Sequence, residues 1–447
     1  MTPQLAFILA SLFVGFALYI EHKGSDDTSM ATWIPSLWLL YSASKQLGTW
    51  LNITTTIEAG SLPDRYFLLT LGALGTLVLL RRHFSWSGAL KKNNLLILVV
   101  SYMLLSAIWS RVPGISLRRW GREAIAVIMA SLLASEQFPI KAFFSTLRRA
   151  IYIALPYSLL LIKYFPLYGR QYNRWTGELT WVGVASQKNG LALLCAFSAV
   201  FLIWSLWESL LKWNLLVSKL PVLINILMLS LSLFLMMGPG RTFKYSATSF
   251  LSLLTGLIIL IFLRIAVIKG IGIKGIIISV AIAVIFIGTF MPFSGKVPIK
   301  EIPMMLGRDP TLTGRIQIWN ALVPYAIKKI ILGHGFGGFW TTSLREQIAS
   351  HAHNGYLDTI LDLGFTGLIL FSIFLISITV KCIKSINIKP DFSLLCLSII
   401  IMFLIHNVGE VSLGNISSFP CSLIVLFSFL IHDKKNEIKI NSRGIDS

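Results

Sequence analysis

Arginine residues recur in the short polar segments that separate long apolar runs of this chain. They lie in L-R-R-W-G-R-E (Arg118, Arg119, Arg122), before a Q-K-N motif (Arg170, Arg174), in G-P-G-R-T (Arg241) and in G-R-D-P-T-L-T-G-R (Arg308, Arg315). A guanidinium group keeps its charge and binds phosphate in a bidentate manner. Convergence of these segments predicts a diphosphate site, while the alternative for any single arginine is contact with lipid headgroups through its long side chain.

Two histidines stand further along the chain in H-A-H-N, directly before an apolar run that starts near residue 356. Histidine is the usual general base near neutral pH, so His353 is predicted to be catalytic and His351 to contact substrate. Two alternatives stay open, a metal site with His334 as third ligand and a structural role in capping the next helix. Because no Asp, Glu or Cys cluster accompanies the histidines, we predict neither a metal nor another cofactor.

Further ionisable residues lie at the edges of apolar runs. Lys188 belongs to S-Q-K-N before one run, and His406 and Glu410 belong to I-H-N-V-G-E near the end of another. Ionisable groups at such positions are candidate functional residues. Ion pairing is the structural alternative, Glu410 with one of the arginines and Arg122 with the adjacent Glu123.

The composition places the chain in a membrane. Hydrophobic residues make up 55% of its 447 residues, charged residues only 13%, and the mean hydropathy is +0.75. A soluble domain of this size needs a more polar surface. The net charge of +20 is typical of cytoplasmic Lys and Arg and of contact with anionic lipid headgroups, so no nucleic-acid partner is predicted. Scattered cysteines without C-x-x-C spacing favour packing roles over disulfides or zinc: Cys195, Cys382, Cys396 and Cys421.

About twelve apolar segments are predicted to cross the membrane as helices, because a helix satisfies its own backbone hydrogen bonds in lipid. Their approximate limits are 4–20, 65–80, 94–109, 122–136, 149–165, 189–206, 220–236, 245–265, 271–292, 356–380, 392–408 and 417–432. The first lacks a basic leader and a cleavage site, so we expect it to be retained as a helix. Trp33–Ala43 is too short to span and is expected to be interfacial or re-entrant. The expected fold is an all-α, polytopic transmembrane helix bundle.

Lysine and arginine residues between the spans predict the orientation. Those near residues 81–92, 141–149, 212–219, 269–274, 381–389 and 434–435 fall on one side, which is expected to be cytoplasmic. With Trp33–Ala43 left out of the count, both termini are expected on that side. The expected organisation is residues 1–291 as transmembrane helices 1–9, 292–354 as a large extracytoplasmic catalytic loop, 355–432 as C-terminal helices and 433–447 as a cytoplasmic tail.

The loop of residues 292–354 is the longest stretch without a span. Loops of this length seldom persist without a role, so we expect it to cover the active site. Its glycines, Gly333–Gly338, lack the lysine and the preceding strand of a phosphate-binding loop. They are predicted to form a flexible hinge.

Three segments together resemble the O-antigen ligase/polymerase family, which includes the WaaL ligases, the Wzy polymerases and ExoQ-type exopolysaccharide polymerases. They are T-G-R-I-Q-I-W (Thr313–Trp319), L-G-H-G-F-G-G-F (Leu332–Phe339) and H-N-G-Y-L-D (His353–Asp358), in that order before G-x-x-G (Gly364–Gly367). W-I-P-S-L-W (Trp33–Trp38), S-Q-K-N and L-G-R-D-P-T-L-T-G-R are closer to the ExoQ-like branch. The resemblance covers about residues 30 to 430.

This resemblance implies a GT-C-like glycosyltransferase of the bacterial inner membrane, inverting and independent of metals, whose donor is an oligosaccharide on undecaprenyl diphosphate. It assigns the family's loop arginine to Arg315, its loop histidine to His353 and a membrane-edge arginine to Arg241, although G-P-G precedes Arg241 where the family has a serine-rich helix end. These three are the predicted catalytic residues. Residues predicted to bind the diphosphate or glycan are Arg118, Arg122, Arg174, Lys188, Arg308, Glu410 and His351.

The expected function is polymerisation of lipid-linked O-antigen, capsule or exopolysaccharide repeats at the periplasmic face. Two alternatives remain, a ligase that transfers the glycan to lipid A–core or to protein, and a flippase of lipid-linked glycan. The expected partners are the undecaprenyl-diphosphate-linked donor, a lipid-linked or lipid A–core acceptor, membrane lipids and a chain-length regulator.

Overall fold

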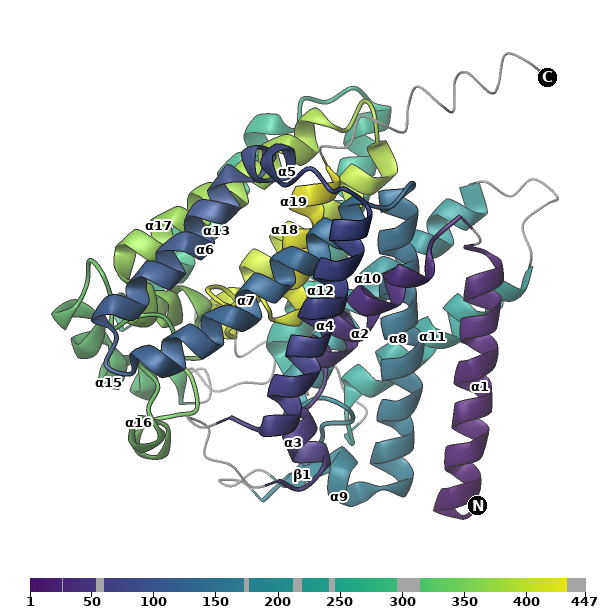
Figure 1. Cartoon of the computed structure of the whole chain (residues 1–447), viewed down its shortest axis with the longest axis horizontal. Helices are drawn as coiled ribbons and strands as arrows, with labels where there is room; N and C mark the ends of the chain where they lie inside the picture. Colours follow the sequence, from purple (N-terminus) through teal and green to yellow (C-terminus); the bar gives the residue numbers. More distant parts are fainter. Residues whose placement is uncertain are drawn as a thin grey trace.

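The chain folds into a bundle of α-helices, seen in a computed structural model that describes residues 1–25, 27–53, 60–172, 177–211, 219–240, 246–295 and 314–431 (Figure 1). Its helices are α1 (Pro3–Lys23), η1 (Met30–Thr32), α2 (Trp33–Ala43), α3 (Leu47–Trp50), α4 (Leu62–Arg81), α5 (Trp86–Lys92), α6 (Asn94–Leu105), η2 (Ser106–Trp109), α7 (Pro113–Ala134), α8 (Pro139–Tyr164), α9 (Pro166–Gly169), α10 (Lys188–Leu211), α11 (Lys219–Met237), α12 (Ala247–Ile268), α13 (Lys274–Ser294), α15 (Arg315–Lys328), α16 (Thr342–Gln347), α17 (Gly355–Lys384), α18 (Pro390–Gly409) and α19 (Phe419–Leu430). Strands β1 (Arg170–Tyr172) and β2 (Leu179–Trp181) pair as an antiparallel hairpin, with Arg170 opposite Trp181.

Eight of the described helices are long and apolar enough to cross a membrane, namely α1, α4, α10, α11, α12, α13, α17 and α18. The pair α5 and α6, bent by 92°, makes a ninth if it is counted as one span. Helices α7 and α8 are as long, with 22 and 26 residues, but they carry more polar side chains. The prediction of an all-α, polytopic membrane protein is confirmed.

Burial separates a central helix from peripheral ones. In α18, 89% of the residues in its most apolar 18-residue stretch are buried inside the protein. In α1 the corresponding share is 17%. An apolar helix that exposes most of its surface needs lipid around it, because water would leave those side chains unfavourably solvated. Helix α18, which packs against α10, α12, α13, α17 and α19, is therefore the core that positions residues at its end.

One end of the bundle carries a concentration of lysine and arginine, and we call it the basic end. Arg82, which follows α4, pairs there with Glu136 before α8 at 2.7 Å. Lys381 of α17 donates to the carbonyl of Lys92 at the end of α5, at 3.0 Å. We call the opposite end, where α4 begins and α18 finishes, the site end. In Figure 1 the basic end lies at the top of the view.

Helix α1 runs from the site end to the basic end. Its Ser11 contacts the Tyr157 hydroxyl at 2.9 Å, while Glu21, ten residues later, pairs with Arg149 at 2.7 Å. Because Arg149 precedes Tyr157 in α8, the two helices are antiparallel. Since α8 begins at the basic end, the first residues of the chain lie at the site end.

The following segment brings the chain back across the bundle. At the basic end Thr32 accepts a hydrogen bond from Arg149 at 2.8 Å. At the site end the Tyr41 hydroxyl donates to Asp64 in the first turn of α4, also at 2.8 Å. The 11 residues of α2 alone cover only about 16 Å. The preceding turn η1 and the extended residue Ser44 supply the remaining length.

The described part of the chain starts and finishes at opposite ends of the bundle, and the expected placement of both termini on one side of the membrane stays a prediction. Phe427, near the end of α19, packs against Phe143 and Phe392 in the first turns of α8 and α18, so α19 finishes at the basic end. The first residues of α1 lie at the opposite end (Figure 1). If Trp33–Ala43 is counted as part of a crossing of the bundle, the first residues of α1 and the end of α19 fall on opposite sides.

Cysteine labelling in intact cells tests this arrangement. We expect Thr2→Cys and Tyr172→Cys to react from one side of the membrane with an impermeant maleimide, and Lys384→Cys from the other. The four native cysteines are buried and provide a low background. Labelling of residues 2 and 384 from the same side would contradict the path through α2.

Candidate active site

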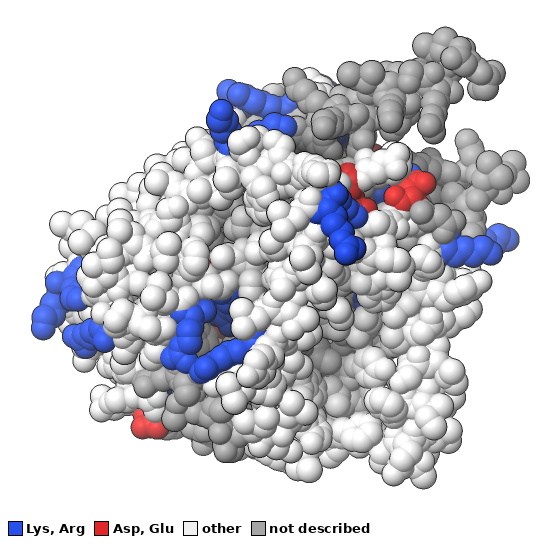
Figure 2. All heavy atoms as spheres, viewed as in Figure 1, with Lys and Arg blue, Asp and Glu red and all other residues white. Residues whose placement is uncertain are grey.

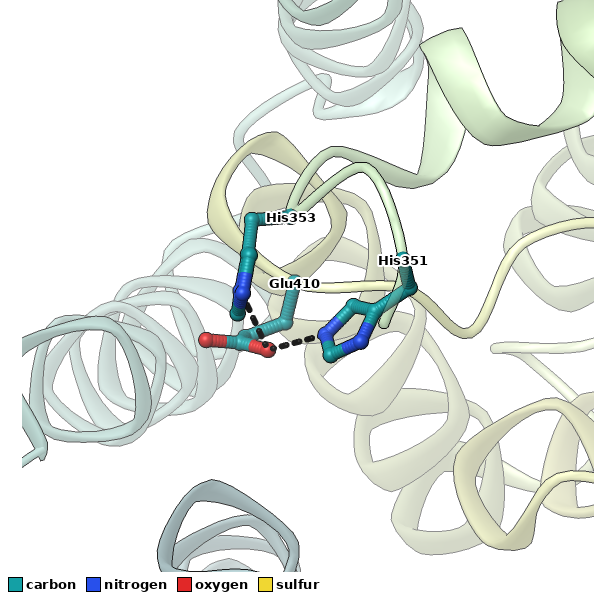
Figure 3. A group of neighbouring side chains, drawn as sticks. All are labelled: His351, His353 and Glu410. Atoms are coloured by element: carbon teal, nitrogen blue, oxygen red, sulfur yellow. Dashed lines mark ion pairs between the residues drawn. The ribbon is translucent and has the colours of Figure 1, made fainter. Parts of the chain in front are cut away.

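Glu410 is the centre of a polar cluster at the site end of the bundle. It directly follows the last residue of α18 and is 4% exposed. Its Oε1 accepts hydrogen bonds from Arg315 Nη2 at 2.9 Å and from Asn189 Nδ2 at 2.5 Å. Its Oε2 faces His351 Nε2 at 3.5 Å and His353 Nδ1 at 3.6 Å (Figure 3). Residues from α10, α15, α18 and the turn before α17 therefore meet at one carboxylate.

Arg315 is placed by the backbone around it. It is the first residue of α15 and follows Gly314, whose φ of +84° sets the direction in which the helix starts. Its guanidinium lies 3.5 Å from Thr248 Oγ1 in the first turn of α12. A Cβ on Gly409 would lie 2.7 Å from Arg315 Nη1, so a larger residue at this position would displace the guanidinium from its place beside Glu410.

A tightly held turn presents the two histidines. The carbonyl of Ala352 accepts a hydrogen bond from Trp319 Nε1 at 2.9 Å, and its N–H donates to Asp358 Oδ1 at 3.1 Å. His353 has a φ of +49°, in the left-handed region that non-glycine residues seldom adopt. Such a conformation persists only where surrounding contacts fix it. The ring positions of His351 and His353, with centroids 4.1 Å apart, are therefore built into the fold.

Asn354 caps the helix that follows this turn. Its Oδ1 accepts from Leu357 N at 2.8 Å, and its Nδ2 donates to the carbonyls of Gly288 and Val408 at 3.0 and 3.2 Å. Asn354 thus ties α13 and α18 to the start of α17. The structural alternative considered for H-A-H-N, capping of the next helix, holds for its asparagine rather than for its histidines.

The charge states of Glu410 and His353 follow from their surroundings. Burial opposes ionisation of Glu410, but His351, His353 and the Arg315 guanidinium outweigh it and hold the pKa of this carboxyl well below its ordinary value. Burial lowers the pKa of His353 below its ordinary value and outweighs the opposite influence of Glu410. Near neutral pH the site therefore contains a carboxylate beside a neutral His353 imidazole.

The glycine-rich turn before the histidines is fixed rather than flexible. Asp362 accepts hydrogen bonds from the N–H groups of Gly337 and Phe339 at 3.1 and 3.2 Å. Phe336 N donates to Ser106 Oγ at 2.9 Å. Arg119 also donates to the carbonyl of Gly337. The prediction of a flexible hinge is wrong, because these contacts immobilise the turn against η2, α7 and α17.

The first part of α17 is separated from the rest by a break at Gly364. This residue has a φ of +67°, and the next two N–H groups donate to the carbonyls of Ile330 and Ile331 instead of continuing the helix. A Cβ at this position would lie 2.1 Å from the Ile331 oxygen. The segment with Asp358 and Asp362 is thereby anchored to the chain that follows α15.

The predicted site residues separate into three groups. Arg315, His351, His353 and Glu410 lie together, and the ion pair of Glu410 with an arginine, weighed as an alternative, is present. Lys188 lies at the start of α10 beside Asn189, which makes the contact to Glu410. Arg174, Arg241 and Arg308 lie outside the described residues.

Arg118 and Arg122 both lie on α7. Arg118 is exposed and donates to the carbonyl of Gly114 at 3.3 Å. Arg122 lies 3.8 Å from Glu123, as the ion-pair alternative expected. Glu123 in turn accepts hydrogen bonds from Ser417 N and Oγ at 2.6 and 2.8 Å, in the segment after Glu410. Helix α7 thus contacts the same α18–α19 connection that carries the carboxylate.

Figure 2 shows basic side chains around a hollow in the surface, over the first half of α7. Helix α7 carries Arg118, Arg119 and Arg122 in its first half. The basic end forms a separate group at the top of the same view. Positive charge at the site end is therefore not confined to the buried cluster.

Two residues of the site were not identified from the sequence. Asn189 was overlooked in favour of its neighbour Lys188, and Thr248 carried no signal beyond its place at a helix start.

His334, considered as a third metal ligand, hydrogen bonds instead to the Leu361 carbonyl at 2.9 Å. His406 is buried within α18.

Among the described residues, His351, His353 and Glu410 form a group that could hold a metal ion, since one ligand atom from each lies within 4.8 Å of the others. Their chemistry also suits proton transfer. A carboxylate beside Nδ1 favours the tautomer with a proton there, which leaves Nε2 of His353 free to accept another.

Fold and site together define a multi-pass membrane protein with a buried acid–base cluster at one end of its bundle. Comparison with known proteins finds two similarities. The profile Wzy_C, described as O-antigen ligase, matches residues 233–372. The exopolysaccharide production protein ExoQ of Rhizobium meliloti (strain 1021) is 23% identical over 303 residues, covering 62% of this chain and 62% of that protein. These two matches make the chain similar to the O-antigen ligase/ExoQ-like family and support that relationship.

The family profile includes Arg315, His351 and His353, whereas Glu410 and Asn189 lie outside residues 233–372. The match to ExoQ spans less than two thirds of the length of that relative. The similarity therefore agrees with the position of the cluster without assigning a role to each of its residues.

Replacement of Gly364 tests the anchoring of the broken helix. Gly364→Ala is expected to destabilise the protein by at least about 2 kcal/mol, because a left-handed alanine and a backbone overlap are both unfavourable. The measurement is the thermal unfolding midpoint in detergent. Gly15→Ala is the matched control, since nothing lies within 4 Å of a Cβ at that position in α1. Equal midpoints for the two variants would contradict the fixed break.

Proposed function

We propose that this protein is a membrane glycosyltransferase that polymerises undecaprenyl-diphosphate-linked oligosaccharide repeats at the periplasmic face of the bacterial inner membrane. The observation that carries the proposal is the cluster in which Glu410 contacts Arg315 and faces His353. Membership of a glycosyl transfer family supports the reaction class.

The orientation follows from the positive-inside rule. The basic end holds Arg81, Arg82, Lys91, Lys92, Lys381 and Lys384, and such residues favour the cytoplasmic side. The site end then faces the periplasm, together with the N-terminus. A donor on a polyprenyl carrier would present its diphosphate at the membrane surface, which is where the cluster lies in this orientation.

In the proposed reaction an acceptor hydroxyl attacks the anomeric carbon of the donor sugar. A new glycosidic C–O bond forms as the bond from this carbon to the diphosphate oxygen breaks, with inversion at the carbon. The hydroxyl proton passes to Nε2 of His353, while Glu410 holds the ring and stabilises the imidazolium that results. The lipid diphosphate leaves with the bonding electron pair.

Charge on the departing diphosphate requires fixed cations. Arg315 is 18% exposed, so a substrate phosphate can reach its guanidinium. We assign the same task to Arg241 and Arg308, and substrate contacts to Arg118, Arg122, Arg174, Lys188 and His351. Cations aimed at charge that develops in the transition state contribute most to catalysis. Arginines in this role would make the reaction independent of a divalent metal.

Substitution of the central residues tests the mechanism. Arg315→Ala and His353→Ala are each expected to lower transfer at least about 100-fold, as loss of a transition-state contact does. The measurement is turnover of a lipid-diphosphate oligosaccharide by purified protein, together with polymer in cells at equal membrane content. Arg111→Ala, an exposed arginine near the glycine-rich turn, is the control. Wild-type turnover in either central variant would refute the assignment.

The pH dependence tests the partnership of Glu410 with His353. Transfer should fall as the pH drops through the pKa of His353, because the protonated ring cannot accept a proton. Glu410 raises this pKa, so Glu410→Gln should move the acidic limb of the pH–rate profile to lower pH while reducing the maximal rate. An unmoved limb would show that Glu410 does not act on the base.

A ligase is the second candidate, because the matching family profile is described as O-antigen ligase. Polymerase and ligase differ in acceptor, a second lipid-linked repeat against lipid A–core or protein. Deletion of the gene distinguishes them through the glycan left on undecaprenyl diphosphate. Loss of long chains from the carrier supports the polymerase, and accumulation of long chains on the carrier supports the ligase.

A further inference from the structure

The facing edges of His351, His353 and Glu410 form a set of three converging ligand atoms. His351 Nε2 and His353 Nδ1 approach the same oxygen, Oε2 of Glu410, at 3.5 and 3.6 Å (Figure 3). All three ligand atoms lie within 4.8 Å of one another. We propose that these three residues form a binding site for one Zn²⁺ ion.

The distances fit coordination better than direct hydrogen bonding. Protein N–H···O bonds have donor–acceptor distances of about 2.7 to 3.2 Å, shorter than both contacts. Zinc ligands lie about 2.0 to 2.1 Å from the metal, which puts neighbouring ligand atoms of a tetrahedral site about 3.3 Å apart. The two distances from imidazole nitrogen to carboxylate oxygen, 3.5 and 3.6 Å, lie within a few tenths of an ångström of this spacing.

The second nitrogen of His351 sets the direction of its free lone pair. Its Nδ1 lies 2.8 Å from Ser350 Oγ. When Nδ1 donates to this hydroxyl, Nε2 presents a lone pair to the carboxylate, and the two repel unless a cation lies between them. His353 Nδ1 is buried and has no hydrogen-bond partner among the described residues. Each imidazole therefore directs one nitrogen at Oε2 of Glu410.

The surroundings of the carboxylate complete the site. Arg315 and Asn189 hold Oε1 of Glu410, so Oε2 keeps its orientation toward the histidines. Outer contacts of this kind fix the ligands of protein metal sites and contribute to affinity. The Arg315 guanidinium also repels the zinc ion and so weakens its binding. It does not block the binding, because Arg315 contacts the other carboxylate oxygen, Oε1.

The ligand set selects zinc over the hard divalent ions. Two imidazoles and one carboxylate with an open fourth position are typical of zinc sites. Magnesium and calcium require six or more oxygen ligands, and imidazole suits neither. We therefore expect millimolar Mg²⁺ not to compete with micromolar Zn²⁺ for the cluster.

Zinc at this position would inhibit glycosyl transfer, a consequence that rests on the proposed function. The ion would take the place of the proton on His353 Nδ1 and bind Oε2 of Glu410. The ring could then no longer be stabilised as an imidazolium after accepting the acceptor's proton. Binding itself requires only the geometry of the three residues.

The test is a zinc titration of the full-length protein, purified in detergent and first stripped of metal with a chelator. A chromophoric zinc indicator competes with the protein for the added zinc and reports the amount bound. Wild-type protein should bind one Zn²⁺ per chain. His351→Ala, in a partly exposed turn, and Glu410→Gln, which keeps the side-chain shape, should each weaken binding at least about 10-fold. Size-exclusion profile and helical circular dichroism establish that both variants are folded. His22→Ala, which removes an exposed histidine at the basic end, should bind as wild type.

Absence of stoichiometric binding to wild type, or unchanged affinity in both site variants, would overturn the zinc site. A transfer assay at saturating zinc keeps the two proposals apart. Zinc that binds and inhibits supports both. Zinc that binds while transfer continues at full rate supports the metal site and contradicts the base role of His353.

Discussion

The site depends on one buried negative charge, the carboxylate of Glu410. Burial of an unpaired carboxylate is strongly unfavourable, so the fold must bring partners to it. Arg315 and Asn189 occupy one oxygen, and the two histidines face the other. These partners come from sequence positions separated by more than two hundred residues. The requirement to satisfy this charge therefore links α10, α15, α17 and α18 at the site end.

The backbone around Glu410 is adapted to that requirement. Gly409 leaves space for the Arg315 guanidinium, and the left-handed His353 aims its ring at the carboxylate. Asn407 Oδ1 accepts from the N–H groups of Ser412 and Leu413 at 2.8 and 2.7 Å, which fixes the chain just beyond Glu410. Each of these three features is local in sequence, yet each supports a contact between segments that are distant in sequence. Loss of any one would change the geometry of the ion pair.

The sequence contained the helices and the reactive residues but not their pairing. Hydropathy predicts long spans because lipid selects for them, and residue type singles out Arg315, His353 and Glu410. The contact of Asn189 could not be foreseen, since it depends on how α10 packs against α18. Hydropathy alone predicts no crossing at α2, where a short helix and its non-helical neighbours together connect the two ends of the bundle. The glycine-rich turn was taken for a hinge because its partners, Asp362 and Ser106, are distant in sequence.

Two ion pairs of similar geometry show why the Glu410 cluster, rather than another charged pair, suits a reaction. Arg149 and Glu21 are 2.7 Å apart, and each side chain is 1% exposed, so neither can meet a ligand. Arg315 and Glu410 are 2.9 Å apart, but the arginine is 18% exposed and the adjacent His353 is 24% exposed. A closed pair holds helices in place and exchanges partners only if the fold opens. In the partly exposed pair, the Arg315 guanidinium can hydrogen bond to a phosphate while the Glu410 carboxylate remains beside the His353 imidazole. Glycosyl transfer from a lipid diphosphate would require this change of partners.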